Sequence, residues 1–309
     1  MTTDAVAAVA PSAASAAPAA SPAAPSEAGS VRSGRAVGVS LIVAGMLSVN
    51  FGSAVAALLF PRAGALGVVT LRLVLAATLL LVVCRPRLRG YSRGDWAVVC
   101  GFGVALGAMN SLFYAAIDRI PLGAAVTLEV LGPLALSVIA ARRLSGLMWA
   151  GLALAGVFLL SGGDLGGLDP AGAALALGAG AMWAAYILLS ARAGARFPKA
   201  DGLALAMAVG ALCSLPLGVA TSGGALLQPV TLGLGLAVAV LSSGLPYTME
   251  LFALRRLPAA TFAVLMSLAP AVAATAGFLV LGQALGAAQY AGIALVVAAS
   301  AGAVLAGRR

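Results

Sequence analysis

The chain has 309 residues, of which 62% are hydrophobic and 9% are charged, and its mean hydropathy is +1.09. These values exclude an ordinary soluble domain and predict a polytopic membrane protein with all-α architecture. The net charge of +9 would suggest nucleic acid as a partner of a soluble chain. In a membrane protein it is better explained by basic loop residues that fix helix orientation, so we expect no nucleic-acid partner. The chain has no histidine and no C-x-x-C pair among its three cysteines, so we expect neither a metal site nor another cofactor.

The first 36 residues are rich in Ala, Pro and Ser, and we expect them to form a disordered cytoplasmic tail. They lack the basic segment and apolar core of a signal peptide. A docking arm is the alternative for this tail. Ten apolar segments follow, and most have the roughly 20 residues that a membrane-spanning helix needs. They are residues 38–60, 64–84, 97–117, 121–141, 147–163, 170–190, 202–221, 231–254, 258–281 and 287–306.

A stretch at residues 110–133 has a counterpart 137 residues later, at 247–270. Both copies have an arginine, a proline that starts a helix and a second proline within that helix: Arg119, Pro121 and Pro133, then Arg256, Pro258 and Pro270. Glu129 of the first copy falls on Met266 of the second, so only the first copy carries the acid. Two halves that share one pattern but differ in one buried charge are typical of transporters.

The basic loop residues predict the orientation. Fifteen of them fall in one alternating set of segments, whereas only Arg62 and Arg119 fall in the other set. By the positive-inside rule, both termini are cytoplasmic and the protein lies in the cytoplasmic membrane. Because each half has five spans, an odd number, the second half enters the bilayer from the opposite side. We therefore expect two inverted five-helix repeats, at residues 37–165 and 166–309.

The segment IPLGAAVTLEVLGPLAL at residues 120–136 contains the motif T-L-E-x-x-G-P. With the ten helices, the five-plus-five repeat and the paired Arg-x-Pro helix starts, it resembles the EamA-type transporters of the drug/metabolite transporter superfamily. Within them it is most similar to the threonine/homoserine exporter group, and the resemblance covers residues 38–306. The resemblance implies a secondary active exporter of small amino acids such as threonine or homoserine, driven by protons or by another gradient.

Three charged residues are expected inside the spans: Arg72, Glu129 and Glu250. Such residues are costly in lipid and face a partner or a water-filled cavity. Arg72 and Glu129 each lie about eight residues from the outer start of their helix, so their depths match and an ion pair is possible. That pair could only lock two helices together. Alternatively, Glu129 receives the substrate's amino group or a proton, while Arg72 faces a carboxylate. Glu250 is near the cytoplasmic end of its span, where snorkelling or local pairing is favoured.

Four prolines are expected to shape the helices around this site. Pro133 lacks the N–H that would donate to the carbonyl of Glu129, so it frees that carbonyl and bends the helix. Pro121 and Pro258 suit the first turn of a helix, where an N–H is not needed. Pro270 is the counterpart of Pro133, and kinks at these positions could serve as hinges.

Uncharged polar residues complete the candidate site. Asn50 and Asn110 could donate hydrogen bonds to a zwitterion or bond a neighbouring helix. Tyr114 and Tyr247 could line a cavity, although Tyr114 is also close enough to the interface to be an anchor there.

Other functions are less well supported. An EamA-type exporter of another small metabolite or drug is the main alternative, although a lone intramembrane arginine argues against organic phosphates. An enzyme is not expected, because the chain has no histidine and no paired acids within a span. A membrane scaffold without transport is the remote alternative. No nucleotide-binding G-x-x-x-x-G-K-[ST] motif points to ATP as the energy source.

Overall fold

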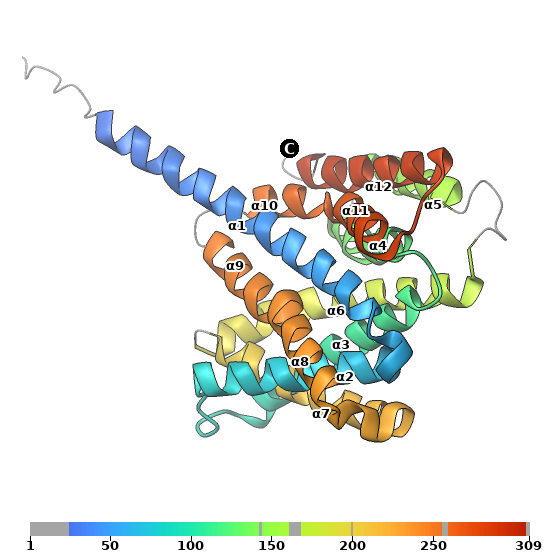
Figure 1. Cartoon of the computed structure of the whole chain (residues 1–309). Coiled ribbons are helices and arrows are strands. Elements are labelled where there is room, and N and C mark those ends of the chain that lie inside the picture. The colour runs from blue at the N-terminus through green and yellow to red at the C-terminus, as the bar shows by residue number, and fades with distance from the viewer. Residues whose placement is uncertain (1–24, 142–143, 161–167, 199, 255–258, 307–309) are drawn as a thin grey trace, which may run out of the picture.

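The computed structural model describes residues 25–141, 144–160, 168–198, 200–254 and 259–306. Every regular element in these ranges is a helix (Figure 1). In chain order the elements are α1 (Pro25–Ala57), α2 (Phe60–Cys84), α3 (Arg93–Ile117), α4 (Leu122–Ala141), α5 (Leu144–Leu160), α6 (Pro170–Arg196), α7 (Asp201–Ser222), η1 (Gly223–Leu227), α8 (Pro229–Ala239), η2 (Val240–Gly244), α9 (Leu245–Leu254), α10 (Ala259–Met266), α11 (Ala269–Leu281) and α12 (Ala287–Ala306).

Ten apolar helical stretches account for the membrane character of the described chain. Seven are long and apolar enough to cross a bilayer: Ala36–Ala57, Phe60–Cys84, Arg93–Ile117, Pro170–Arg196, Asp201–Leu227, Val264–Leu281 and Ala287–Leu305. Three shorter ones are Leu122–Leu136, Met148–Leu160 and Pro229–Gly244. In order, these ten stretches match the ten predicted spans, so the all-helical polytopic class and the number of segments are confirmed.

The expected tail is wrong in its extent. Helix α1 begins at Pro25, so residues 25–36, which we expected to be disordered, are helical, and α1 projects well beyond the rest of the bundle (Figure 1). Proline suits the first turn of a helix, and most of the Glu, Ala, Ser, Val and Arg residues that follow it are compatible with helix. The apolar part of α1 starts only at Ala36. Residues 1–24 lie outside the described chain.

Two of the predicted spans are interrupted. The segment expected at residues 231–254 consists of α8, one wide turn of π-helix (η2) and α9. The segment expected at 258–281 is divided into α10 and α11, and Pro270 lies in the first turn of α11. In contrast, α4 continues through Pro133. The two repeat-related prolines therefore act differently, since one lies within a continuous helix and the other near the start of a new one.

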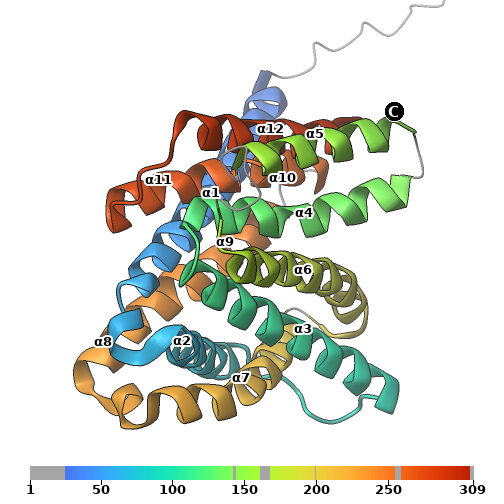
Figure 2. The ribbon, with the colours of Figure 1, turned by 90° about the vertical axis from the view of Figure 1, so that its right-hand side faces the viewer.

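The helices pack in layers. Helices α5 and α12 form one end of the stack, followed by α4 with α11, then α6, then α3, and finally α2 with α7 (Figure 2). Helices α1 and α9 pack against each other and run diagonally across this stack (Figure 1). Helix α4, which carries Glu129, is therefore an inner helix with α6 on one side, α5 and α12 on the other, and α11 beside it in its own layer (Figure 2).

The start of α4 is fixed by the end of α11. At that end Gly282 adopts a left-handed conformation with φ 66°, and the Gln283 N–H donates to the Gly277 carbonyl at 3.1 Å. This C-terminal motif needs a glycine because other residues are strained at positive φ. It places the Gln283 side chain so that its Oε1 accepts the Leu122 N–H at 3.0 Å. A residue of the second half thus caps the helix that carries Glu129 in the first half.

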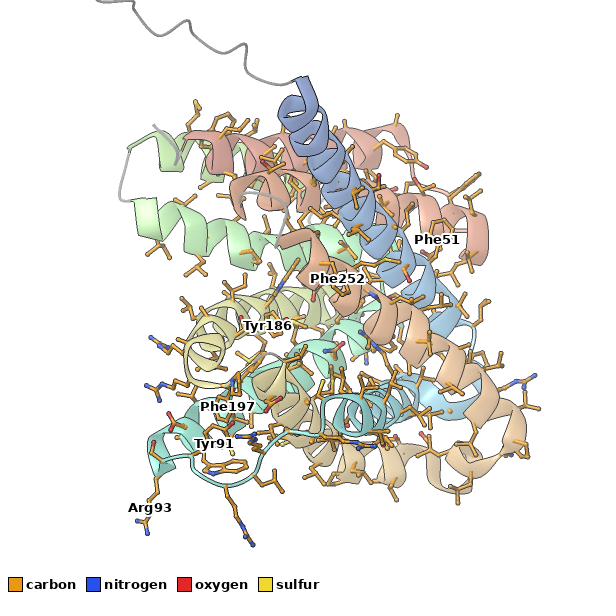
Figure 3. All side chains as sticks on the ribbon, turned by 90° about the vertical axis from the view of Figure 1, so that its left-hand side faces the viewer. Phe51, Tyr91, Arg93, Tyr186, Phe197 and Phe252 are labelled. Carbon is orange, nitrogen blue, oxygen red and sulfur yellow. The ribbon has the colours of Figure 1, made fainter. Side chains whose placement is uncertain are left out.

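One end of the bundle carries charged and aromatic residues. There Arg93 points away from the helices, near the rings of Tyr91 and Phe197, which pack at a tilt of 37° with their centroids 4.3 Å apart (Figure 3). Arg196 at the end of α6 forms an ion pair with Asp95 in the first turn of α3 at 3.2 Å. These contacts hold the N-terminal end of α3 against the C-terminal end of α6.

Candidate functional site

Arg72 lies in the middle of α2 with only 4% of its surface exposed. It makes three hydrogen bonds, all to residues of other helices. Its Nε donates to Ser243 Oγ at 3.0 Å, and its Nη2 donates to the Ser242 carbonyl at 2.8 Å. Its Nη1 donates to the hydroxyl of Tyr114 at 3.0 Å. The guanidinium is therefore satisfied on one edge by η2 and at one terminal nitrogen by α3, as a buried charge requires.

The η2 turn can accept these bonds because its backbone departs from the α-helix. Pro246, four residues after Ser242, lacks the N–H that would occupy the Ser242 carbonyl in a regular α-helix. The neighbouring Leu241 carbonyl accepts the hydroxyl of Ser48 on α1 at 2.6 Å. Wide turns of this kind recur at functional sites, where they expose backbone groups that an α-helix would hide.

Tyr114 on α3 supports the arginine with both its ring and its hydroxyl. Its side chain is fully buried, and the Arg72 Cζ lies 5.4 Å from the centroid of its ring, within range for a cation–π contact. The Phe60 ring packs against it with centroids 5.9 Å apart. In this structure Tyr114 is therefore a core residue that binds Arg72.

Glu129 lies in α4 and is half-buried, whereas most of the residues around it in the helix are buried. On the α6 side, the backbone of Gly180 approaches so closely that a Cβ at Gly180 would lie 2.5 Å from the Glu129 carbonyl oxygen. Gly132 approaches the same Gly180 backbone from α4. Two glycines thus allow α4 and α6 to cross in direct backbone contact at the level of Glu129, as small residues do in membrane helices.

Arg72 and Glu129 do not form an ion pair. The ion pairs within the described ranges are Arg119–Asp169 at 3.4 Å and Arg196–Asp95 at 3.2 Å. The pairing that their matching depths allow is absent because η2 and Tyr114 hold the guanidinium. No described residue donates a hydrogen bond to the Glu129 carboxylate, which leaves this side chain available to a ligand or a proton.

The two asparagines are buried and bond within their own helices. Asn50 Nδ2 donates to the Met46 carbonyl at 2.8 Å, and Asn110 Nδ2 donates to the Leu106 carbonyl at 2.8 Å. Neither amide nitrogen therefore bonds a neighbouring helix as we considered from the sequence. Both side chains are about 95% buried, with exposures of 5% and 4%.

Of the remaining predicted residues, the structure describes Pro121 in full but not the others. Pro121 lies directly before α4, and its carbonyl accepts the Ala125 N–H at 3.0 Å. The side chains of Tyr247 and Glu250 and the whole of Pro258 lie outside the described residues.

Sequence reasoning missed Ser242 and Ser243, although a signal for them exists. The sequence S-S-G-L-P at residues 242–246 places two small polar residues just before a proline inside an apolar span. Such a cluster predicts a break in the helix whose freed backbone needs partners. What it does not predict is that the partner is Arg72, which lies 171 residues from Ser243 along the chain.

A groove of about 520 Å³ lies between α10, α11 and α12 and is lined almost entirely by apolar residues. It contains neither Arg72 nor Glu129, so it is separate from the candidate site. Within the described ranges, no three His, Cys, Asp or Glu side chains cluster as metal ligands would.

Comparison with known proteins gives consistent results. A model of the EamA-like transporter family matches residues 170–305. The threonine/homoserine exporter RhtA of Salmonella typhimurium strain SL1344 is 42% identical over 273 residues, which cover 88% of this chain and 92% of that protein. RhtA of Escherichia coli strain K12 is 41% identical over the same shares. A crystal structure of a protein with 20% sequence identity has the same fold, with a TM-score of 0.53 over 90% of this chain and 99% of that one.

Proposed function

The chain belongs to the EamA-like transporter family, with the threonine/homoserine exporters RhtA among its relatives, and on this premise we propose that it exports threonine, homoserine or similar small amino acids. It is a multi-pass protein of the inner membrane with the apolar helices that such an exporter needs. We propose that both termini face the cytoplasm, because fifteen basic loop residues fall on that side against two on the other.

The observation that carries the proposal is the separation of two opposite charges, the buried Arg72 and the half-buried Glu129. Both residues lie in apolar helical stretches, and within the described ranges they form no ion pair with each other. Charges placed within a membrane protein are costly unless something pairs with them. A zwitterionic amino acid carries a carboxylate for the arginine and an ammonium group for the glutamate. The arrangement thus complements an amino acid better than it complements an anion or a neutral drug.

Glu129 is also the group that we propose to carry the coupling proton. Its carboxylate has no hydrogen-bond donor among the described side chains and backbone amides, and it lies on an inner helix next to Pro133. A carboxylate that binds either a proton or the substrate's ammonium group couples the two, because only one can occupy it at a time. Outward movement of the amino acid would then be exchanged for inward movement of a proton.

We propose that the two halves are inverted repeats, an architecture that suits an alternating-access carrier. In such a repeat each predicted span corresponds to the span five positions away, so α1 corresponds to α6, α3 to α9 and α4 to α11. The contact of α3 with α6 then predicts a contact of α9 with α1, and the contact of α4 with α6 predicts one of α11 with α1. Both predicted contacts exist. The contacts α2–α7, α5–α12 and α4–α11 each map onto themselves, and these contacts exist as well. This pattern is the one that two copies related by a two-fold axis would produce.

The test uses Glu129→Gln in proteoliposomes. The near-isosteric change should leave the protein folded and abolish threonine transport driven by a proton gradient. Exchange of labelled for unlabelled threonine should survive, because it moves no net proton and the amide oxygen of glutamine can still accept a hydrogen bond from the ammonium group. Glu250→Gln, which we place near a cytoplasmic helix end from the sequence, is the control and should transport at the parent rate. Driven transport by Glu129→Gln at the parent's rate would falsify the coupling role. Equal exchange of threonine and of unrelated metabolites would point instead to a broader metabolite exporter.

A further inference from the structure

We propose that Ser243, the Ser242 carbonyl and Tyr114 form a seat for Arg72, which holds the guanidinium apart from Glu129 and presents its remaining donors to the substrate carboxylate. These three groups are positioning groups, because they act through Arg72 and not on the substrate. The inference rests on the proposed function and deepens it, since it says how this site recognises a carboxylate.

The count of donors supports the seat. A guanidinium has five N–H donors in one plane. Nε and Nη2 use one donor each on η2, and Nη1 uses one on Tyr114. One N–H is left on each terminal nitrogen, and no described residue accepts a hydrogen bond from either. Two N–H groups on adjacent terminal nitrogens are what an arginine uses to bind both oxygens of a carboxylate.

The seat is fixed by the helices around it. Ser48 on α1 holds the Leu241 carbonyl, and Gly52 on the same helix leaves room for the Ser242 side chain, which a Cβ there would contact. The Ser242 hydroxyl is buried with no hydrogen-bond partner among the described residues. The wide turn of η2 therefore leaves one buried polar group unsatisfied, which is unfavourable. The turn is thus maintained by its contacts with α1 and α2.

Pro246 makes the backbone part of the seat possible. If an N–H stood at this position, it would bond the Ser242 carbonyl and compete with Arg72 for it. Arg72 would then lose one of the two acceptors on η2, and its long side chain could turn to the unpaired Glu129. The resulting ion pair would consume the two charges that we assign to the two ends of the substrate.

The preference for L-threonine over L-threoninol is a readout that a purely structural role of the seat would not affect. L-threonine and L-threoninol share the ammonium group and the side chain, but threoninol has a hydroxymethyl group in place of the carboxylate. The ratio of their apparent affinities in counterflow therefore measures carboxylate recognition alone. A general loss of folding or of packing lowers the uptake of both compounds and leaves the ratio unchanged.

The experiment measures this ratio in proteoliposomes for Ser243→Ala, Pro246→Ala and the nearly isosteric Tyr114→Phe. Each should reduce the preference for threonine by about three- to tenfold, as expected for one polar contact between membrane helices. The matched controls are Ser53→Ala, whose hydroxyl bonds only the Val49 carbonyl of its own helix, and Pro216→Ala within α7. Both controls should keep the parent's ratio.

Two further variants separate this inference from the proposed function. Arg72→Gln should abolish the preference; if it keeps the parent's ratio, Arg72 does not bind the carboxylate, and the site assignment fails together with the seat. If Arg72→Gln abolishes the preference but the three seat variants keep it, the proposed function stands and the seat is refuted. Adding Glu129→Gln to Ser243→Ala should restore the preference, because Arg72 then has no competing carboxylate. Failure to restore it would refute the idea that the seat keeps the two charges apart.

Discussion

Replacing Gly180 by alanine tests whether the contact of α4 with α6 fixes the position of Glu129. The added methyl group would lie 2.5 Å from the carbonyl oxygen of Glu129 and 3.3 Å from its Cα. Ordinary van der Waals contact begins at 3.4 Å, so the helices must separate by about 0.9 Å, the difference between 2.5 and 3.4 Å. Both obstructing atoms belong to the backbone and cannot turn aside as a side chain would. The substitution therefore has to displace the segment of α4 that carries the glutamate.

The change in stability caused by Gly180→Ala is the sum of two opposing effects. Overpacking a close contact costs about 1–3 kcal/mol, whereas alanine in place of glycine within a helix contributes about 0.5–1 kcal/mol of stability. Gly194 on the same helix has no atom within 4 Å of a Cβ placed there, so Gly194→Ala gains the second effect without the first. Gly180→Ala should thus be less stable than Gly194→Ala by about 1–3 kcal/mol, although both make the same chemical change in α6.

The assay is thermal unfolding of the purified variants in detergent, together with threonine exchange in proteoliposomes. For a chain of this size, about 1 kcal/mol shifts the midpoint by roughly 2 °C. Gly194→Ala should unfold at or above the parent's midpoint and exchange threonine normally. Gly180→Ala should unfold several degrees below Gly194→Ala and exchange threonine more slowly. Equal midpoints and equal exchange for the two variants would show that α4 and α6 are not in backbone contact at Glu129.

Two further predictions concern the ends of the helices. In a cysteine-free background, single cysteines at Thr2 and Arg309 should stay unlabelled by an impermeant thiol reagent in intact cells, whereas cysteines at Asp169 and Gln228 should react. Labelling of either terminus from outside would reverse the proposed orientation and, with it, the inference of export. Although burial opposes it, the pKa of the Asp169 carboxyl is lowered by the backbone N–H groups that this carboxylate caps at the start of α6 and by its ion pair with Arg119. Because the folded pKa is below the unfolded value of about 3.9, the stabilisation is present above that value and is lost as the pH falls through the folded pKa. The thermal midpoint of Asp169→Asn should therefore depend less on pH in this acidic range than the midpoint of the parent. Identical pH profiles for the two proteins would contradict this assignment.

The sequence was sufficient for the class, the spans and the family. A bilayer leaves few choices for a chain that spans it, because every backbone polar group must be satisfied within a helix, so the lengths of the apolar segments predict the helices directly. The T-L-E-x-x-G-P motif indicated the threonine/homoserine exporter group, and the 42% identity to RhtA confirms that resemblance. The extent of the tail was predicted wrongly, because Ala-, Ser- and Pro-rich sequence does not distinguish clearly between helix and disorder. Helix α1 begins at Pro25, within the segment that we expected to be disordered.

The sequence also indicated that Arg72 and Glu129 matter, but it could not identify their partners. Matching depth along two helices places two residues at the same level without fixing how each helix is rotated. The partner of Asn50 could not be predicted from the sequence either, because its amide donates to the carbonyl one turn earlier in its own helix and not to a neighbouring helix. Such local bonds compete with every long-range partner that a sequence pattern suggests.

What the sequence by itself determined is therefore the set of helices, their order and the identity of the few polar groups that the membrane encloses. What only the tertiary structure decided is which of these groups meet. Arg72 is bonded to Ser243 and Tyr114, which lie 171 and 42 residues away along the chain, while Glu129 remains unpaired among the described residues. The physical reason is that apolar length and periodicity act within one helix, whereas a buried arginine is satisfied by whichever acceptors the packing of several helices brings within about 3 Å.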